Sequence, residues 1–371
     1  MLEKIKSLKQ VAEETNETLG EIKKFNVQNG YRPPSIRGAG SLRVVDTKLK
    51  VELSMKDKDS EQRRFGLFKS KRGYNSKYKT SKQTANYANH YGEYLAYIIL
   101  KQLGKDVCKV DLGNLEIINS YSKKLAIVEG CLSHYELEEN ETVELICIIL
   151  ESYKNAHPKK YRELTQRGKT NSNQNNTNIE LILKSLEEVC KQNGQEYKIP
   201  DIRKSFFDMC IFDIKFANRD RHDDNFGLKI NQENEIEFYS LFDNEQILGL
   251  QEEKQYVTKY LSNPKEYEKF KNKELTSCIG IPGKIQQIKP MELLEYLLEN
   301  YPEETQDSLK DIGRYTISNL EETLEICPGL SEEHKQLAKK IFLEREKEIE
   351  ETVKAFNEKQ SLKTIDDGPD L

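Results

Sequence analysis

The chain is 371 residues long, enough to bury a sizeable core and to form two lobes or two domains. Charged residues make up 33% of it and hydrophobic residues 36%, and the net charge of −5 gives no general indication of nucleic-acid binding. No apolar run approaches the roughly 18 residues that cross a membrane, and the first residues lack the apolar core of a secretory signal. The seven cysteines form no Cys-x-x-Cys pair. They fit packing in the core of a protein in a reducing compartment better than zinc binding or disulfide bonds. We therefore expect a cytoplasmic protein, either in the cell that makes it or, after delivery, in a host cell.

Residues 1–35 are predicted to form a helical N-terminal extension. Its apolar side chains follow a helical spacing, and the pair Pro33-Pro34 ends it. The apolar positions are Leu8, Val11, Leu19, Ile22 and Phe25.

A short glycine-containing segment follows, ahead of strand-like stretches at 42–45 and 49–53. A glycine-rich turn between strands can bring backbone amides close to phosphate groups. Gly38, Gly40 and Ser41 are therefore candidate phosphate-binding residues. An ordinary surface turn would have the same composition, so both interpretations stay open.

Lys69 is a stronger candidate for nucleotide binding. It ends a predicted strand at 64–69, and a helix is predicted to begin at Tyr91 with Glu93 in its first turn, where the helix dipole favours a carboxylate. Kinases use a strand lysine and a helix glutamate in this way to direct the lysine toward the α- and β-phosphates of ATP. The alternative is a surface lysine and an ordinary first-turn acid.

The stretch 62–92 has no acidic residue and eight basic ones, interleaved with tyrosines. Such a mixture can bind single-stranded nucleic acid. Because it lies beside Lys69, we instead expect a flexible basic loop over the nucleotide site. Direct contact with nucleic acid is the less favoured alternative.

Residues 124–132 are predicted to form a buried strand that runs into a hinge between two lobes. Backbone groups near Glu129 and Cys131 would then meet the adenine. Beyond residue 137 the apolar spacing is mostly helical, and the polar run 167–178 is a predicted loop. The predicted helices are 141–155, 178–193, 201–217, 290–300, 303–325 and 331–357.

The most informative segment is 218–225, which reads Asn-Arg-Asp-Arg-His-Asp-Asp-Asn. Asp220 and Asn225 stand five residues apart, as in a kinase catalytic loop, where the aspartate meets the substrate hydroxyl and the asparagine binds magnesium. The apolar run 206–216 predicts a buried helix that leads into the loop. A solvated polar turn that only caps a helix is the alternative.

Two short strands, 226–230 and 236–241, are predicted to pair as a hairpin around the polar turn 231–235. The hairpin would return the chain so that Asp243 lies beside Asn225. Carboxylate and amide oxygens suit magnesium, so these two residues are the predicted metal ligands.

A wider motif contains these residues. It reads Asn218-x-Asp220-x-His222-x-x-Asn225-Phe226, followed by the hairpin and Phe242-Asp243. This motif resembles the signature of HipA-like kinases, which are bacterial serine/threonine kinases with a divergent kinase fold, and several of which are toxins. It is more distantly similar to the loop of phosphatidylinositol kinases. The histidine follows the aspartate instead of preceding it, which departs from ordinary eukaryotic kinases.

The resemblance extends to other candidates. HipA-like kinases carry a short glycine-containing phosphate loop near 38–41, and a Phe-Lys and Gly-Glu pattern like that around Lys69 and Glu93. His222 has two interpretations, a residue that locks the loop by hydrogen bonds or a direct phosphate contact. Asp223 and Asp224 are expected to face solvent or to form salt bridges.

The sequence thus predicts an α+β, bilobal, protein-kinase-like fold, with a sheet-rich nucleotide-binding N-lobe at 36–131, a helical C-lobe carrying the catalytic loop at 132–357 and a flexible tail at 358–371. The resemblance implies ATP- and magnesium-dependent phosphorylation of serine or threonine on a protein. If the chain is a toxin or effector, the resemblance implies a component of translation as its target. It also implies a small regulatory or antitoxin partner. HipA-like toxins usually carry a further small domain ahead of the phosphate loop, whereas about 36 residues precede it here, so the toxin role does not carry over simply.

Two alternatives belong to other classes. One is a phosphatidylinositol-type lipid kinase, suggested by the likeness of the loop. The other is a binding module that keeps a kinase fold without catalysis, although a degenerate kinase usually lacks at least one of Lys69, Asp220, Asn225 and Asp243.

Overall fold

The computed structural model describes residues 5–26, 36–37, 50–56, 63–71, 87–118, 125–138, 140–165, 177–274, 277, 279–284 and 288–366. The predicted phosphate loop with Gly38, Gly40 and Ser41 lies outside these residues, as does most of the predicted basic loop. The polar run that begins at residue 167 falls largely outside them too.

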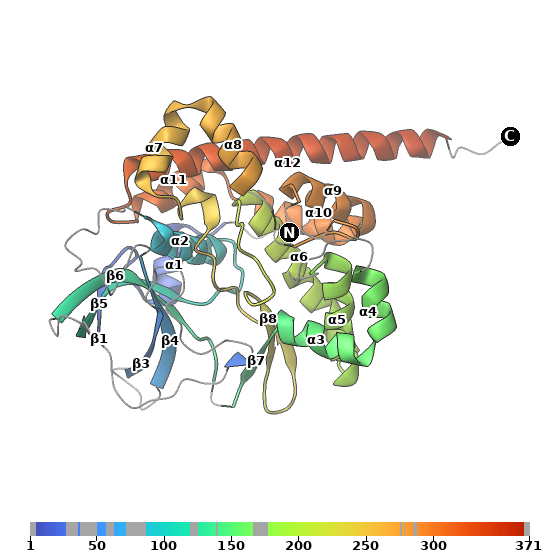
Figure 1. Cartoon of the computed structure of the whole chain (residues 1–371), viewed down its shortest axis with the longest axis horizontal. Coiled ribbons are helices and arrows are strands. Elements are labelled where there is room, and N and C mark those ends of the chain that lie inside the picture. Colours follow the sequence, from blue (N-terminus) through green and yellow to red (C-terminus); the bar gives the residue numbers. More distant parts are fainter. Residues whose placement is uncertain are drawn as a thin grey trace.

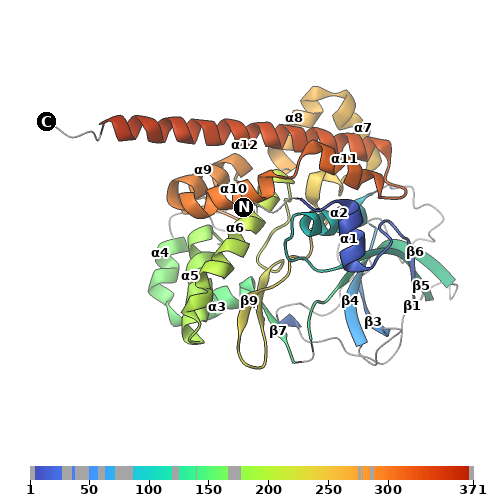
Figure 2. The ribbon, with the colours of Figure 1, turned by 180° about the vertical axis from the view of Figure 1, so that it is seen from behind.

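The N-lobe is built on a five-stranded sheet in the order β1-β5-β6-β4-β3. Its strands are β1 (Lys23–Asn26), β3 (Lys50–Lys56), β4 (Arg63–Ser70), β5 (Val110–Ile118) and β6 (Leu125–His134). The pairs β3–β4, β4–β6 and β5–β6 are antiparallel, whereas β1 runs parallel to β5. One helix, α2 (Asn89–Gln102), packs against β5 and β6, and the short helix α1 (Leu8–Thr15) packs against α2 (Figure 2).

The N-terminal segment belongs to this lobe, which corrects the prediction of a separate helical extension. The helix α1 ends at Asn16, whose left-handed backbone caps it, and the chain then enters the sheet as β1. Phe25 of β1 is buried, and its ring meets that of Phe68 edge-on at 5.9 Å between centroids. The helical spacing was misleading because Phe25 is buried on a strand that pairs with a distant segment, while Ile22 is exposed.

The C-lobe is helical and is centred on α6 (Ile199–Lys215), which packs against helices on several sides. The other helices of this lobe are α3 (Ile146–Ala156), α4 (Pro158–Thr165), α5 (Ile179–Gln192), α7 (Lys254–Ser262), α8 (Pro264–Glu274), α9 (Pro290–Asn300), α10 (Pro302–Gly313), α11 (Ile317–Glu325) and α12 (Glu332–Asp366). Of these, α5, α9, α10 and α12 contact α6. Figure 1 shows the large sheet on one side of the molecule, α3 to α6 on the other, and α12 reaching across the helical part and beyond it. The α+β fold class is therefore confirmed.

A second, small sheet joins the lobes in the order β2-β7-β8-β9. It contains β2 (Ile36–Arg37), β7 (Thr142–Leu145), β8 (Gly227–Ile230) and β9 (Ile236–Phe238). β7 pairs with β8, and β8 pairs with β9, in both cases antiparallel. The first residues of the helix predicted at 141–155 are therefore strand.

Two other predicted helices differ from the structure. The helix predicted at 303–325 is two helices, because Thr316 and Asn319 form a capping box that starts α11. The last helix continues to Asp366, so most of the predicted tail is helical. Among the described residues, no helix combines the length and the apolar character that a membrane crossing requires.

The role of β1 predicts a measurable difference between its two faces. Phe25→Ala should lower the free energy of unfolding by about 3–5 kcal/mol, the usual cost of deleting a buried phenylalanine ring. Lys24→Ala, at an exposed position of the same strand, should change it by less than about 0.5 kcal/mol. Urea denaturation of both variants tests this, and equal stabilities would show that β1 is not part of the lobe's core.

Candidate active site

The predicted catalytic loop, residues 218–225, begins just after α6 ends. Phe216 caps the helix, and Ala217 turns the chain with a left-handed backbone (φ 51°). The next residue, Asn218, is tied back to the helix: its backbone N–H donates to Asp213 O at 2.9 Å, and its Nδ2 donates to Asp213 Oδ1 at 2.8 Å. The start of the loop is therefore held by the last turn of a buried helix.

Arg221 is buried at the centre of the loop and organises it. Its Nε and Nη2 donate to the two carboxylate oxygens of Asp213 at 2.9 and 3.2 Å. Its Nη1 donates to two backbone carbonyls, Asn225 O and Phe242 O, both at 2.9 Å, and Nη2 also contacts Asn244 Oδ1. Burial alone would lower the pKa of Arg221, but the Asp213 carboxylate outweighs it and raises the pKa.

Asp220 and Asn225 are brought together by this loop, as the sequence predicts. Asn225 Nδ2 donates to the backbone carbonyl of Asp220 at 2.6 Å, and the backbone N–H of Asp220 donates to Asn218 Oδ1 at 3.3 Å. Since the amide nitrogen of Asn225 is used in this way, its Oδ1 is the atom that can serve a cation. The Asp220 carboxylate accepts a hydrogen bond from Gln246 Nε2.

The predicted hairpin forms, and it returns Asp243 to the loop. Leu228 pairs with Phe238, and the turn 231–235 closes with Asn234 in a left-handed conformation. Because Arg221 Nη1 binds the carbonyls of Asn225 and Phe242 together, the two predicted metal ligands lie on backbone segments that share one anchor. Asp243 itself is left-handed, with φ 55°.

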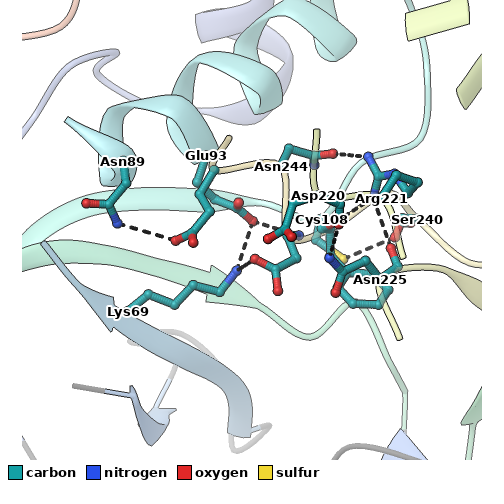
Figure 3. Close-up of polar contacts among 12 residues, drawn as sticks. Lys69, Asn89, Glu93, Cys108, Asp220, Arg221, Asn225, Ser240 and Asn244 are labelled. Carbon is teal, nitrogen blue, oxygen red and sulfur yellow. Dashed lines mark hydrogen bonds and ion pairs between the residues drawn. The ribbon is translucent and has the colours of Figure 1, made fainter. Parts of the chain in front are cut away.

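Lys69, Glu93 and Asp243 converge from three elements of the chain. Lys69 Nζ lies 2.8 Å from Asp243 Oδ1 and 3.4 Å from Glu93 Oε1, and Glu93 Oε1 also accepts the backbone N–H of Asp243 at 2.9 Å. Figure 3 shows Lys69 and Glu93 beside the loop that carries Asp220, Arg221 and Asn225. Burial alone would lower the pKa of Lys69, but the charges of Asp243 and Glu93 raise it well above its ordinary value.

Gly92 makes this convergence possible. A Cβ atom at this position would lie 2.4 Å from the backbone oxygen of Glu245. Only glycine lets the first turn of α2 approach the segment after Asp243 so closely. Asn89, in the same turn, adds a hydrogen bond of 3.3 Å to Glu245 Oε2. The Gly-Glu pair in the sequence is thus one structural unit.

Glu129 and Cys131 occupy the interior of β6, not the end of it. Cys131 is buried and pairs with Lys69 on β4, and the pairing continues through Ser133 and His134. The strand therefore ends at His134 and not near Cys131, because its pairing with β4 extends beyond the apolar run of the sequence, and the hinge stays a prediction. Glu129 bonds His90 Nε2 at 3.1 Å, and this hydrogen bond holds the pKa of Glu129 at about 2.

His222 lies in the turn of the catalytic loop and is partly exposed. Its Nδ1 accepts the backbone N–H of Asp224 at 3.3 Å, as expected for a residue that locks the loop, while a phosphate contact stays a prediction. Asp224 is exposed as expected, but Asp223 is buried, and burial together with the charge of Asp224 raises its pKa. Each of these three side chains has a potential metal-ligating atom within 4.8 Å of the others, which does not by itself define a metal site.

Three site residues escaped the sequence analysis: Asp213, Arg221 and Gln246. Arg221 stands inside the motif, but nothing in its spacing distinguishes a buried anchor from a solvated charge. Asp213 does carry a signal, since it is an acid inside the mostly apolar run 206–216. Gln246 carries none, because its role depends on how the segment after Asp243 folds back.

The fold and these residues together define a kinase-like architecture. Its solved relatives in fold include the Helicobacter pylori proinflammatory kinase CtkA, with a TM-score of 0.60 and 17% sequence identity over 83% of this chain and 95% of that one. Shewanella oneidensis MR-1 HipA, in a complex with HipB and operator DNA, matches with a TM-score of 0.47 and 11% identity over 96% of this chain and 73% of that one. No family model and no curated protein matches the chain. The likeness to CtkA shows the fold alone, and it agrees with the resemblance to HipA-like kinases carried by the motif.

The buried anchor predicts a large loss of stability when it is removed. Arg221→Met should destabilise the protein by about 3–5 kcal/mol, because Asp213 would remain as an uncompensated buried charge. The double variant Arg221→Met/Asp213→Leu should recover part of this loss. Arg162→Met, at an exposed position, is the control. Thermal and urea denaturation measure the series, and a double variant no more stable than Arg221→Met would contradict the explanation.

Proposed function

We propose that this protein is a kinase that uses ATP and magnesium to phosphorylate serine or threonine on a protein. The observation that carries the proposal is the convergence of Lys69, Glu93 and Asp243, from strand, helix and loop, beside a loop that joins Asp220 to Asn225. These are the residue types that phosphoryl transfer needs for holding phosphates, binding magnesium and orienting a hydroxyl.

The residues present fit the proposed cofactors. Asn225 Oδ1 and the Asp243 carboxylate are oxygen ligands of the kind that magnesium prefers, and Lys69 supplies a cation for phosphate oxygens. When bound, ATP supplies the phosphoryl group and magnesium neutralises its charge. In the structure Lys69 pairs with Asp243 directly, so the lysine already stands beside the proposed metal ligand. Glu93 holds both partners, since it bonds the lysine and the backbone of Asp243.

Asp220 would orient the substrate hydroxyl and accept its proton. Its backbone is fixed on both sides, by Asn218 at its N–H and by Asn225 at its carbonyl. A base held in this way needs no rearrangement of the loop as the proton moves. His222 accepts the backbone N–H of Asp224 within the turn of the loop, and in this proposal it locks the loop or contacts a phosphate directly.

The substrate class rests on the sequence resemblance, which favours a protein hydroxyl over an inositide. Thiophosphate transfer to whole lysate and to phosphatidylinositol vesicles, with an Asp220→Asn blank in each, tests the choice. Labelling of protein alone supports it, and labelling of lipid alone overturns it.

The toxin role and a small regulatory or antitoxin partner are part of the proposal through the same resemblance. If expression of the chain slows bacterial growth, Asp220→Asn should relieve the inhibition. Growth inhibition of equal strength by the variant would separate the toxic effect from phosphate transfer.

The proposed metal ligands predict an effect of Asp243. Asp243→Ala should lower phosphate transfer on the order of 10²-fold or more, the loss typical of a missing electrostatic stabiliser of the transition state. Autophosphorylation measured across a magnesium titration tests this. Glu237→Ala, an exposed carboxylate on the same hairpin, is the control and should behave as wild type. Full magnesium-dependent activity in Asp243→Ala would show that Asp243 is not a required magnesium ligand.

Asp220 allows chemistry and binding to be separated. Asp220→Asn should lower phosphate transfer by roughly 10²–10⁴-fold, the contribution of a positioned base. Nucleotide affinity depends mainly on Lys69 and the metal ligands, so ATP binding measured by calorimetry and the melting temperature should stay close to wild type. Autophosphorylation at a near wild-type rate would place the chemistry elsewhere.

A further inference from the structure

We propose that Gln246, held by a hydrogen bond from Arg219, is a positioning residue that orients the Asp220 carboxylate. The orientation of this carboxylate then depends on how the segment after Asp243 packs against the rest of the lobe. This inference rests on the proposed function, because it takes Asp220 as the residue that orients and deprotonates the hydroxyl. It concerns residues outside the motif that identified the loop.

The side-chain amide of Gln246 is held at both ends. Its Nε2 donates to Asp220 Oδ2, and its Oε1 accepts from Arg219 Nε at 2.8 Å. Arg219 is in turn held by Glu252, with 3.3 Å between Nη2 and Oε1. Because arginine can only donate, it fixes the oxygen end of the amide and leaves the NH₂ group facing the carboxylate.

This contact differs from the other bonds that Asp220 makes within the loop. Asn218 and Asn225 hold its backbone, whereas Gln246 holds its carboxylate. A carboxylate has about four acceptor positions, so the bond from Gln246 to Oδ2 restricts its rotation without using all of its acceptor capacity. The direction of the proposed base is therefore set from a different segment of the chain.

That segment is rigidly docked. The backbone N–H of Leu248 donates to Phe216 O at 2.8 Å, and Leu248 is fully buried with a left-handed backbone (φ 53°). Gly249 is also left-handed, and a Cβ atom there would lie 2.9 Å from Ile341 Cδ1 of α12. Gln246 stands two residues before Leu248 and is 8% exposed. Any event that undocks this segment would remove the Gln246 hydrogen bond from the Asp220 carboxylate while the backbone bonds within the loop 218–225 stay in place.

Two substitutions separate positioning from packing. Gln246→Met keeps the length of the buried side chain and removes both hydrogen bonds. Gln246→Glu keeps an acceptor for Arg219, now as an ion pair, and turns a second carboxylate toward Asp220. A packing role predicts that the glutamate variant is the better tolerated one. A positioning role predicts the opposite order for phosphate transfer, because the donor is replaced by a like charge.

The measurements are the kcat of autophosphorylation, the KM for ATP and the melting temperature, at about pH 8, where carboxyl groups are ordinarily ionised. We expect Gln246→Met to lose on the order of 10- to 100-fold in kcat, part of the roughly 10²–10⁴-fold that a positioned base contributes. Gln246→Glu should lose more, and in both variants the KM for ATP should stay within about threefold of wild type. Gln195→Met is the matched control, because Gln195 has the same 8% exposure and an amide bonded at both ends to residues 234 and 236.

The outcomes distinguish the two proposals. If the wild-type chain transfers phosphate and both Gln246 variants keep its kcat, the positioning role is wrong while the kinase stands. The positioning role is also wrong if kcat falls only in step with a lower melting temperature. It is wrong as well if the kcat of Gln246→Glu is higher than that of Gln246→Met. If the wild-type chain neither transfers phosphate nor hydrolyses ATP with magnesium, the proposed function is wrong and this inference falls with it.

Discussion

The Arg221 guanidinium, 2% exposed, is bonded to three separate segments of the C-lobe. Asp213 supplies the countercharge from the last turns of α6, and the carbonyls of Asn225 and Phe242 accept from the same nitrogen. Five donors in a fixed planar fork can serve several acceptors at once, which a lysine cannot do. The distance between the two proposed metal ligands follows from this geometry, since each stands at or next to a carbonyl that Arg221 holds.

A second set of contacts joins this centre to the N-lobe. The Glu93 carboxylate accepts hydrogen bonds from Lys69 Nζ and from the backbone N–H of Asp243. One carboxylate on a helix therefore links a strand of the N-lobe to a loop of the C-lobe. The missing side chain of Gly92 allows the approach. A buried ion pair contributes little net stability when all its members are present, but it is costly to break. Here the contacts of Glu93 fix the position of the N-lobe residues relative to the Asp243 segment of the C-lobe.

The backbone near the site is strained at three non-glycine residues. Ala217, Asp243 and Leu248 are all left-handed, and such residues cost roughly 1–3 kcal/mol each. They stand at the end of α6, at the proposed metal ligand and in the docked segment after it. Each is a sharp turn of the chain close to the loop 218–225 or to the segment of Asp243. Packing of Leu248 and the bonds of Arg221 offset the cost.

The sequence by itself determined which residues form the candidate site and much of the C-lobe. Lys69, Glu93, Asp220, Asn225 and Asp243 could be named because each is a reactive type of residue at a spacing that local elements enforce, and α6 and α9 follow from helical periodicity. Tertiary structure alone decided the rest. The strand β1 exists because it pairs with β5, and β6 continues to His134 because it pairs with β4. Arg221 and Gln246 acquire their contacts from carbonyls and carboxylates on other segments. Spacing along the chain carries local geometry, whereas burial and hydrogen bonding between distant segments arise only when the chain has folded.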